Sequence, residues 1–170
     1  MSKLHDSLPD AKGSYLLILF LPGSRTIQVG RLGPMVFDRG WYVYAGSAFG
    51  PGGLAARLGR HLQPLVKAHW HIDHLRTAAK VVAAWMAIGP PVREHDWAAA
   101  LTEGPEAGTA VRGFGCSDCR CLSHLIHFTR RPGRILLRAK LGFDVVAAPL
   151  KEIVKQRPKT PHRAGSSTNV

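Results

Sequence analysis

Acidic residues are scarce in this sequence. The 170 residues include 11 Asp and Glu against 23 Lys and Arg, so the formal net charge is +12. Because charged residues make up only 20% of the chain, the surplus reflects missing acids rather than a high density of bases. A positive field of this size attracts polyanions, so nucleic acid is the first candidate partner and an acidic membrane surface the second.

Long hydrophobic runs and cysteines are also few. No stretch approaches the roughly 20 apolar residues of a membrane helix, and the longest run, Tyr15 to Leu21, has the length of a strand. The first twelve residues contain no apolar segment of the kind found in signal peptides. The three cysteines, Cys116, Cys119 and Cys121, are too crowded for a disulfide framework and favour a reducing compartment. We therefore expect a cytoplasmic protein with no membrane attachment.

Composition predicts one domain with polar ends. An apolar fraction of 45% over 170 residues suits a single globular domain with its own core. We assign residues 1–12 to a flexible N-terminus and residues 13–150 to the domain. Residues 151–170 carry five Lys and Arg against one Glu, which predicts a basic, disordered tail.

Hydrophobic periodicity within the domain predicts an α+β fold with a small antiparallel sheet flanked by helices. The continuous apolar run 15–21 suits a strand buried on both faces, whereas residues 26–30 alternate as a half-buried strand does. Hairpin-like strands precede helices, which favours α+β over a doubly wound sheet. Further strands are predicted at 41–45, 81–88 and 143–148, and helices at 54–66, 70–79, 92–101 and 134–141.

A basic helix is the first candidate for chemistry. No acid occurs from Arg39 to Ile72, and the helix predicted there carries Arg57, Arg60 and His61 next to a glycine-rich turn. Guanidinium groups offer paired donors to phosphate oxygens, so this helix suits a phosphodiester. A solvated helix face fits the same pattern.

Two tyrosines at strand ends are the second candidate. Tyr15 follows Gly13-Ser14, and Tyr44 precedes Ala45-Gly46. A tyrosine hydroxyl near an arginine can orient or deprotonate water, because the cation stabilises phenolate. Gly46 would let the backbone approach a substrate closely. Taken alone, each tyrosine is more often an aromatic residue that packs within a sheet.

Taken in order, these segments resemble the GIY-YIG nuclease core. The segments Gly13-Ser14-Tyr15, Tyr44-Ala45-Gly46 and Arg57 to His61 match its two tyrosine strands and its following helix. The chain from Gly13 to about Ala148 is more closely similar to the Uri-type endonuclease family, formerly a domain of unknown function. The segments that carry this closer likeness are Val29–Gly33, Tyr42–Ala48, Arg60–Leu62, His69–Asp73, Gly113–Gly115, Ser117–Cys119 and Ser123–Leu125.

The resemblance implies a nuclease that cuts DNA with one divalent cation, Mg²⁺ or Mn²⁺. It implies a three-stranded antiparallel sheet flanked by helices. It makes Tyr44 the general base or water-orienting group with Tyr15 assisting, Arg57 the group that stabilises charge on phosphate, and His61 a positioning group. Glu94 would hold the metal. The expected nucleic-acid contacts are Gly46, Ser47, Arg60, His69 and His71.

The sequence departs from the family pattern in two places. The segment from Pro22 to Gly40 separates the two tyrosines, which implies an added hairpin. The asparagine that closes the family's site has no counterpart, because the only Asn is Asn169. Asp118 or His124 could take its place. A non-catalytic nucleic-acid-binding module of the same fold is therefore the alternative function, and the sequence does not indicate an oligomeric state.

Several residues that could bind a metal also have interpretations in which they bind none. Glu94 could be an acid that favours a helix N-terminus. The His69-Trp-His-Ile-Asp-His74 spelling resembles a zinc hydrolase motif but lacks its structural context, which favours polar contacts. Cys116, Cys119, Cys121 and His124 could form a Cys₃His zinc site. Because Cys119 and Cys121 would point apart on an extended backbone, a packed loop is the other interpretation.

Overall fold

The computed structural model describes residues 8–90, 93–142 and 145–148. The predicted tail 151–170 and the first part of the predicted N-terminus lie outside the described residues. The strands are β1 Gly13–Leu21, β2 Arg25–Gln28, β3 Pro34–Phe37, β4 Gly40–Ala48, β5 Lys80–Ile88, β6 Thr109–Ala110, β7 Leu125–Phe128 and β8 Val146–Ala147. The helices are α1 Gly53–Leu62, α2 His71–Leu75, α3 Arg93–Ala100 and α4 Arg134–Leu141, with a short 3₁₀ turn at Gly30–Leu32.

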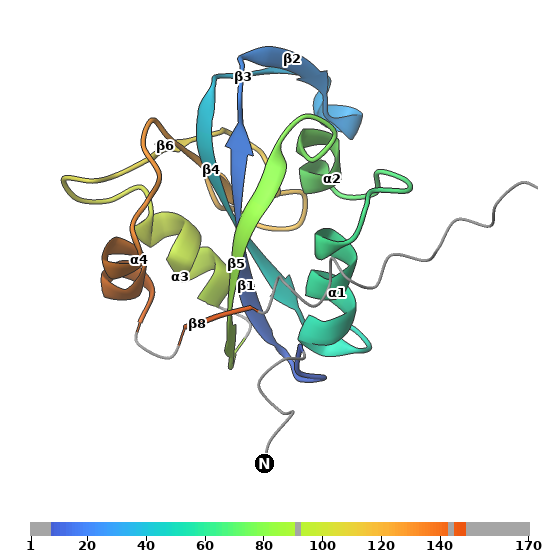
Figure 1. Ribbon diagram of the computed structural model, residues 1–170, viewed down its shortest axis with the longest axis vertical. Helices are drawn as coiled ribbons and strands as arrows, with labels where there is room; N and C mark the ends of the chain where they lie inside the picture. Colours follow the sequence, from blue (N-terminus) through green and yellow to red (C-terminus); the bar gives the residue numbers. More distant parts are fainter. Residues whose placement is uncertain (1–7, 91–92, 143–144, 149–170) are drawn as a thin grey trace, which may run out of the picture.

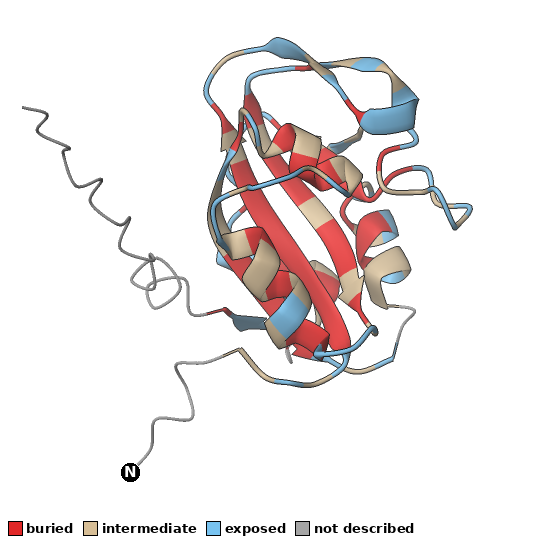
Figure 2. Cartoon of the chain, turned by 90° about the vertical axis from the view of Figure 1, so that its right-hand side faces the viewer, coloured by how far each residue is buried: buried red, intermediate tan, exposed pale blue. Residues whose placement is uncertain are grey.

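The predicted α+β class is confirmed, and the sheet is larger than the resemblance implies. Six strands form one antiparallel sheet in the order β6-β7-β4-β1-β5-β8. The predicted added hairpin is also present, because β2 and β3 pair as a separate two-stranded sheet. Figure 2 shows that this hairpin is largely exposed, whereas the central strands are buried along most of their length.

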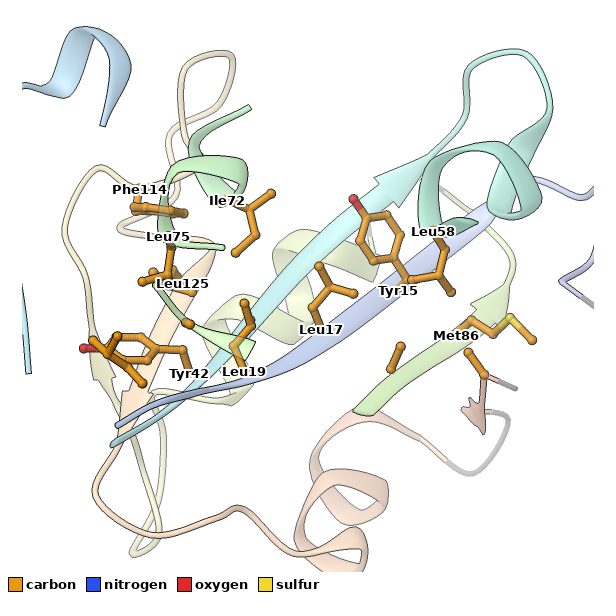
Figure 3. Packing of buried hydrophobic residues seen from close by; sticks show 14 of the residues in the cluster. Tyr15, Leu17, Leu19, Tyr42, Leu58, Ile72, Leu75, Met86, Phe114 and Leu125 are labelled. Carbon is orange, nitrogen blue, oxygen red and sulfur yellow. The ribbon is translucent and has the colours of Figure 1, made fainter. Parts of the chain in front are cut away.

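Helices cover both faces of the sheet, which explains why β1 reads as a continuous apolar run. Leu17 and Leu19 of β1 face a core formed with α1 and α2, around Leu58 and Ile72 (Figure 3). Leu16 of β1 and the side chains that share its face meet α3 and α4 instead. Figure 1 shows the two helix pairs on opposite sides of the central strands.

Two helices end earlier than predicted. The helix expected over 54–66 ends at Leu62, because Gln63 precedes Pro64 and adopts the extended backbone (ψ 163°) that a following proline favours. The helix expected over 70–79 is the single short α2, after which residues 76–79 form turns. No helix in the described ranges has the length and apolar character needed to cross a membrane.

The start of the described chain is held against α1. The carbonyl oxygens of Pro9 and Ala11 accept hydrogen bonds from the backbone N–H groups of Ala55 and Leu54. Leu8 packs against the core on the same side. The segment 8–12, which we predicted to be flexible, therefore satisfies donors in the first turn of α1 that have no partner within the helix.

Candidate active cleft

A cleft of about 300 Å³ gathers many of the predicted site residues. Tyr44, Arg57 and Glu94 all border it, although they come from β4, α1 and α3. The remaining lining residues are Ser47, His69, Trp70, His71, Gly115, Ser117, Asp118 and His124. Of the predicted nucleic-acid contacts, Ser47, His69 and His71 therefore lie at the cleft.

The sheet brings these groups together beside Tyr44. Pairing of β7 with β4 ends at the pair Tyr44 and Leu125, so the edge of β4 beyond Tyr44 has no further strand partner. The segment that precedes β7 borders the cleft here, and His124 accepts one more hydrogen bond, from Ala45 N–H, through its carbonyl oxygen. α1 and α3 approach β4 from the two opposite faces of the sheet.

Trp70 supports the two arginines of α1. The guanidinium carbon of Arg57 lies 4.6 Å from the centroid of the Trp70 ring, and that of Arg60 lies 4.1 Å from it. Arg60 is also bound to Asp73, at 3.1 Å, and to the carbonyl oxygen of Lys67. Arg60 is thus largely committed to protein contacts, whereas Arg57 borders the cleft.

Two of the predicted catalytic residues lie behind the cleft wall. Tyr15 and His61 are each only 1% exposed, and the Tyr15 hydroxyl lies 2.9 Å from Nε2 of His61. His61 Nδ1 faces Asp73 Oδ1 at 3.6 Å, which is beyond hydrogen-bond length. A positioning role fits these two residues, because their burial removes them from direct contact with a substrate.

Asp73 is the centre of this buried group. Its carboxylate accepts hydrogen bonds from the backbone N–H groups of His69 and Trp70 and from the Arg76 guanidinium. Burial by itself would raise the pKa of Asp73, but His61 and the two N–H groups hold that pKa well below its usual range. The His-x-His-x-Asp-His spelling thus has a structural use, because its aspartate caps α2.

Gly46 has a packing role that the sequence did not indicate. A Cβ atom at this position would lie 2.6 Å from the Cζ and Oη atoms of Tyr15. The two residues are direct partners on β4 and β1, so the Tyr15 ring occupies the space over Gly46. Gly46 therefore makes room for Tyr15, and it is not among the residues that line the cleft.

Burial controls the protonation of the tyrosines. It raises the pKa of Tyr44, an effect that Glu94 increases and Arg57 opposes. It also raises the pKa of Tyr15 well above its ordinary value. Both side chains are therefore neutral phenols at neutral pH, and the Tyr44 hydroxyl can donate a hydrogen bond into the cleft.

A His/Cys cluster that could hold a metal ion lies beside the cleft. It comprises His95, Cys119, Cys121 and His124, whose ligand atoms all lie within 4.8 Å of one another. Three of these are residues of the predicted zinc set, and His95 stands where that set had Cys116. His124 belongs to both the cluster and the cleft lining.

The sequence matches the family described as domain of unknown function DUF123 over residues 14–141. The chain therefore belongs to this family. No curated protein and no solved structure matches it.

The structural roles of two residues near the site, Asp73 and His95, were not predicted from the sequence. Asp73 is the first acid after the acid-free stretch, and that isolation could have indicated a carboxylate with several basic partners. His95 directly follows Glu94, but no spacing rule connects it with cysteines more than twenty residues away. Asp118 and His124, suggested as replacements for the missing asparagine, both border the cleft.

Proposed function

We propose that the protein is a metal-dependent DNA endonuclease of the GIY-YIG type, within the Uri-type group. The observation that carries the proposal is the meeting of Tyr44, Arg57 and Glu94 at one cleft, from three separate elements. Phosphodiester hydrolysis needs a group that orients water, a cation for the phosphate charge and a carboxylate for a metal. These three side chains supply one of each.

Charge and cleft chemistry favour DNA as the substrate. The net charge of +12 attracts a polyanion over long distances. At short range, Ser47, His69 and His71 add hydrogen-bonding groups to the same cleft. Burial lowers the pKa of His71, which keeps its ring neutral, and its Nδ1 accepts the N–H of Gly115 at 3.0 Å. The other ring nitrogen of His71 is then a donor suited to a phosphate oxygen.

Arg57 would stabilise the charge that develops on the phosphate. Its guanidinium is flat, permanently charged and stacked on Trp70, so little side-chain freedom is lost when it binds an oxyanion. Because Arg60 is bound to Asp73 and Lys67, it supports the wall instead. We assign the phosphate contact to Arg57.

Glu94 and Asp118 offer hard oxygen ligands on the cleft. One Mg²⁺ or Mn²⁺ ion suits such a site, because these cations keep several waters and take further ligands from phosphate. When bound, the ion would lower the pKa of a water and neutralise phosphate charge. The fit rests on these oxygen donors, which differ in kind from the sulfur and imidazole donors of the neighbouring cluster.

Tyr44 would orient the attacking water. As a neutral phenol it can donate to one oxygen and accept from another. Burial is the main reason that the pKa of Tyr44 is raised; Glu94 raises this pKa further and Arg57 lowers it, so neutralising Glu94 removes one of the effects that keep the phenol protonated. Occupation of Glu94 thus brings Tyr44 nearer to a state that can accept a proton. Tyr15, His61 and Asp73 hold the wall behind it.

A non-catalytic nucleic-acid-binding module is the second candidate. The observations that favour it are the missing asparagine and the raised pKa of Tyr44, because a tyrosine that stays protonated is a poor base. In this function the same cleft and basic surface would bind DNA without turnover.

Cleavage assays separate the two functions. We would incubate single-stranded, duplex and flap DNA with Mg²⁺, Mn²⁺ or EDTA and compare Tyr44→Phe, Arg57→Ala and Glu94→Ala. Each change should reduce metal-dependent cleavage about 10²–10³-fold, as removal of one transition-state contact does. The matched controls Tyr42→Phe, Arg25→Ala and Glu103→Ala change the same residue types away from the cleft and should retain activity.

DNA binding without metal-dependent cleavage of any substrate would reject the enzyme and leave the binding module. Cleavage that survives Glu94→Ala would keep the nuclease but remove the proposed metal ligand. Loss of cleavage with Tyr42→Phe to the same extent as with Tyr44→Phe would show that the effect is not specific to the cleft.

A further inference from the structure

One cluster of metal-ligating side chains has no part in the proposed reaction. His95 lies in the first turn of α3, Cys119 and Cys121 lie in the loop that precedes β7, and His124 ends that loop. It is the one group of this kind found within the part of the chain that the structure describes. Two thiolates and two imidazoles are donors that select zinc over Mg²⁺.

The spacing of the donor atoms suits a tetrahedral ion. Sulfur and nitrogen ligands of one zinc ion lie about 3.5 Å apart, since their bonds to the metal are about 2.3 and 2.0 Å long. His95 Nδ1 lies 3.2 Å from Cys121 Sγ, and Cys119 Sγ lies 3.4 Å from His124 Nε2. Only small side-chain movements would therefore bring all four atoms to one ion.

The conformation of the loop allows Cys119 and Cys121 to reach the same metal ion, which the sequence pattern alone argued against. Cys119 and Cys121 are alternate residues, and an extended backbone would direct them to opposite sides. The chain instead turns at Ser117 and Asp118 and continues without strand structure to Ser123. Both sulfur atoms consequently reach the same cluster.

The cluster would join the two sides of the cleft wall. Its loop carries Ser117, Asp118 and His124 on the cleft, and its helix carries Glu94. Nδ1 of His95 faces Cys121, while Nε2 of the same ring lies 3.7 Å from the Glu94 carboxylate. A carboxylate behind a metal-bound histidine orients the ring, and the ring in turn limits where the carboxylate can go.

We propose that His95, Cys119, Cys121 and His124 form a closed structural zinc site that ties α3 to the Cys/His loop and so positions Glu94 at the cleft. All four coordination positions are filled by protein, which leaves no place for an activated water. Two thiolates balance the charge of the ion. Zinc binding itself does not depend on the proposed nuclease activity, whereas its effect on Glu94 does.

Metal analysis of the full chain, purified without a histidine tag, tests the site. We expect about one zinc per chain, and the cobalt-substituted protein should show the strong visible absorption of tetrahedral thiolate coordination. Cys119→Ser and Cys121→Ser should each reduce bound zinc at least tenfold. Cys116→Ser is the matched control, since Cys116 lies in the same loop but outside the cluster, with its Sγ 3.5 Å from the Phe114 carbonyl oxygen.

Two further measurements cover variants that fail to fold. His95→Cys should retain zinc as a Cys₃His site, whereas His95→Ala should lose it. In the wild-type protein, removing zinc with a chelator should increase hydrogen exchange at residues 113–124 and at the start of α3 more than in β1 and β5. A zinc content far below one per chain, or equal loss with Cys116→Ser, would overturn the site, and unchanged exchange would overturn its structural role.

The two proposals fail separately. Stoichiometric zinc in a protein that never cuts DNA leaves the zinc site and rejects the nuclease. Metal-dependent cleavage by a protein that contains no zinc does the reverse. If both hold, zinc removal should raise the Mg²⁺ concentration needed for half-maximal cleavage, because Glu94 is then less firmly positioned and binds Mg²⁺ more weakly.

Discussion

The ring of Tyr15 fills the space in which every residue other than glycine would place a Cβ atom at position 46. Tyr15 can reach His61 only because this space is open. The glycine of the Tyr-x-Gly sequence is thus required by packing, because Gly46 on β4 lies opposite Tyr15 on the neighbouring strand β1. That requirement gives Gly46 a direct effect on stability.

We predict that Gly46→Ala lowers the free energy of unfolding by about 1–3 kcal/mol, as an added methyl group does in a tightly packed interior. The reason is the 2.6 Å approach of the new Cβ to the Tyr15 ring. Urea denaturation measures the loss. Gly50→Ala is the control, since nothing lies within 4 Å of a Cβ there, and an equal loss in both variants would contradict the explanation.

Between elements, one buried group connects β1, α1 and α2. Tyr15 lies on β1, His61 on α1 and Asp73 on α2, and all three are almost completely buried. Arg60 and Arg76 add two cations to the Asp73 carboxylate. Breaking a buried pair of this kind leaves an uncompensated charge, so these contacts hold the three elements in one arrangement.

This arrangement predicts a loss of stability in acid. Burial lowers the pKa of His61 below its ordinary value of 6.5, so the unfolded chain binds a proton there more readily than the folded protein. The contribution of neutral His61 is complete above that pH and is lost as the pH falls below it. The contribution of Asp73, whose pKa is also lowered, is lost only below its ordinary value of 3.8.

Urea denaturation of the wild type and His61→Gln, at about pH 8 and about pH 5.5, measures the effect of His61. The wild type should lose more stability between the two conditions than the variant does. Equal losses would show that His61 does not carry the dependence, because the other histidines are unchanged in both proteins.

For the molecule as a whole, we expect the net positive charge to govern binding to DNA, the proposed substrate. If phosphate contacts drive binding, the logarithm of the association constant should fall linearly with the logarithm of salt concentration, with a slope near −0.9 for each phosphate neutralised. The 151–170 segment contributes five of the 23 Lys and Arg. These five follow the predicted domain in the sequence, so we expect them to add affinity without taking part in the proposed chemistry.

We predict that changing Lys151, Lys155, Arg157, Lys159 and Arg163 to Gln makes this slope about 2–4 smaller in magnitude. Fluorescence anisotropy over a series of salt concentrations measures it. The cleavage rate at saturating protein should stay unchanged. Substituting Arg25 and Arg31 in the exposed hairpin segment is the control and should alter the slope by less. Binding that does not respond to salt would contradict the electrostatic explanation.

The local pattern of residues in the sequence was enough to predict much of the fold. The uninterrupted apolar run of β1 indicated burial on both faces, and the segment from Pro22 to Gly40 between the two tyrosines indicated the hairpin. The Arg57 helix and the Tyr44 strand were also predictable, because each depends on residues close together in the chain. The ends of helices were harder to predict. The helix α1 ends at Leu62 because the next residue, Gln63, adopts the extended backbone favoured before a proline.

Contacts between distant segments could not be predicted in this way. His95 lies beside Cys119 and Cys121 because α3 packs next to their loop. The backbone of that loop does not form a strand, so the alternation of side chains expected for a strand does not apply to the two cysteines. Tyr15 and His61 lie behind the cleft rather than in it because the helix above the sheet buries both. Short-range periodicity follows from backbone geometry and is visible in the sequence, whereas the depth and partners of a side chain depend on how the layers pack.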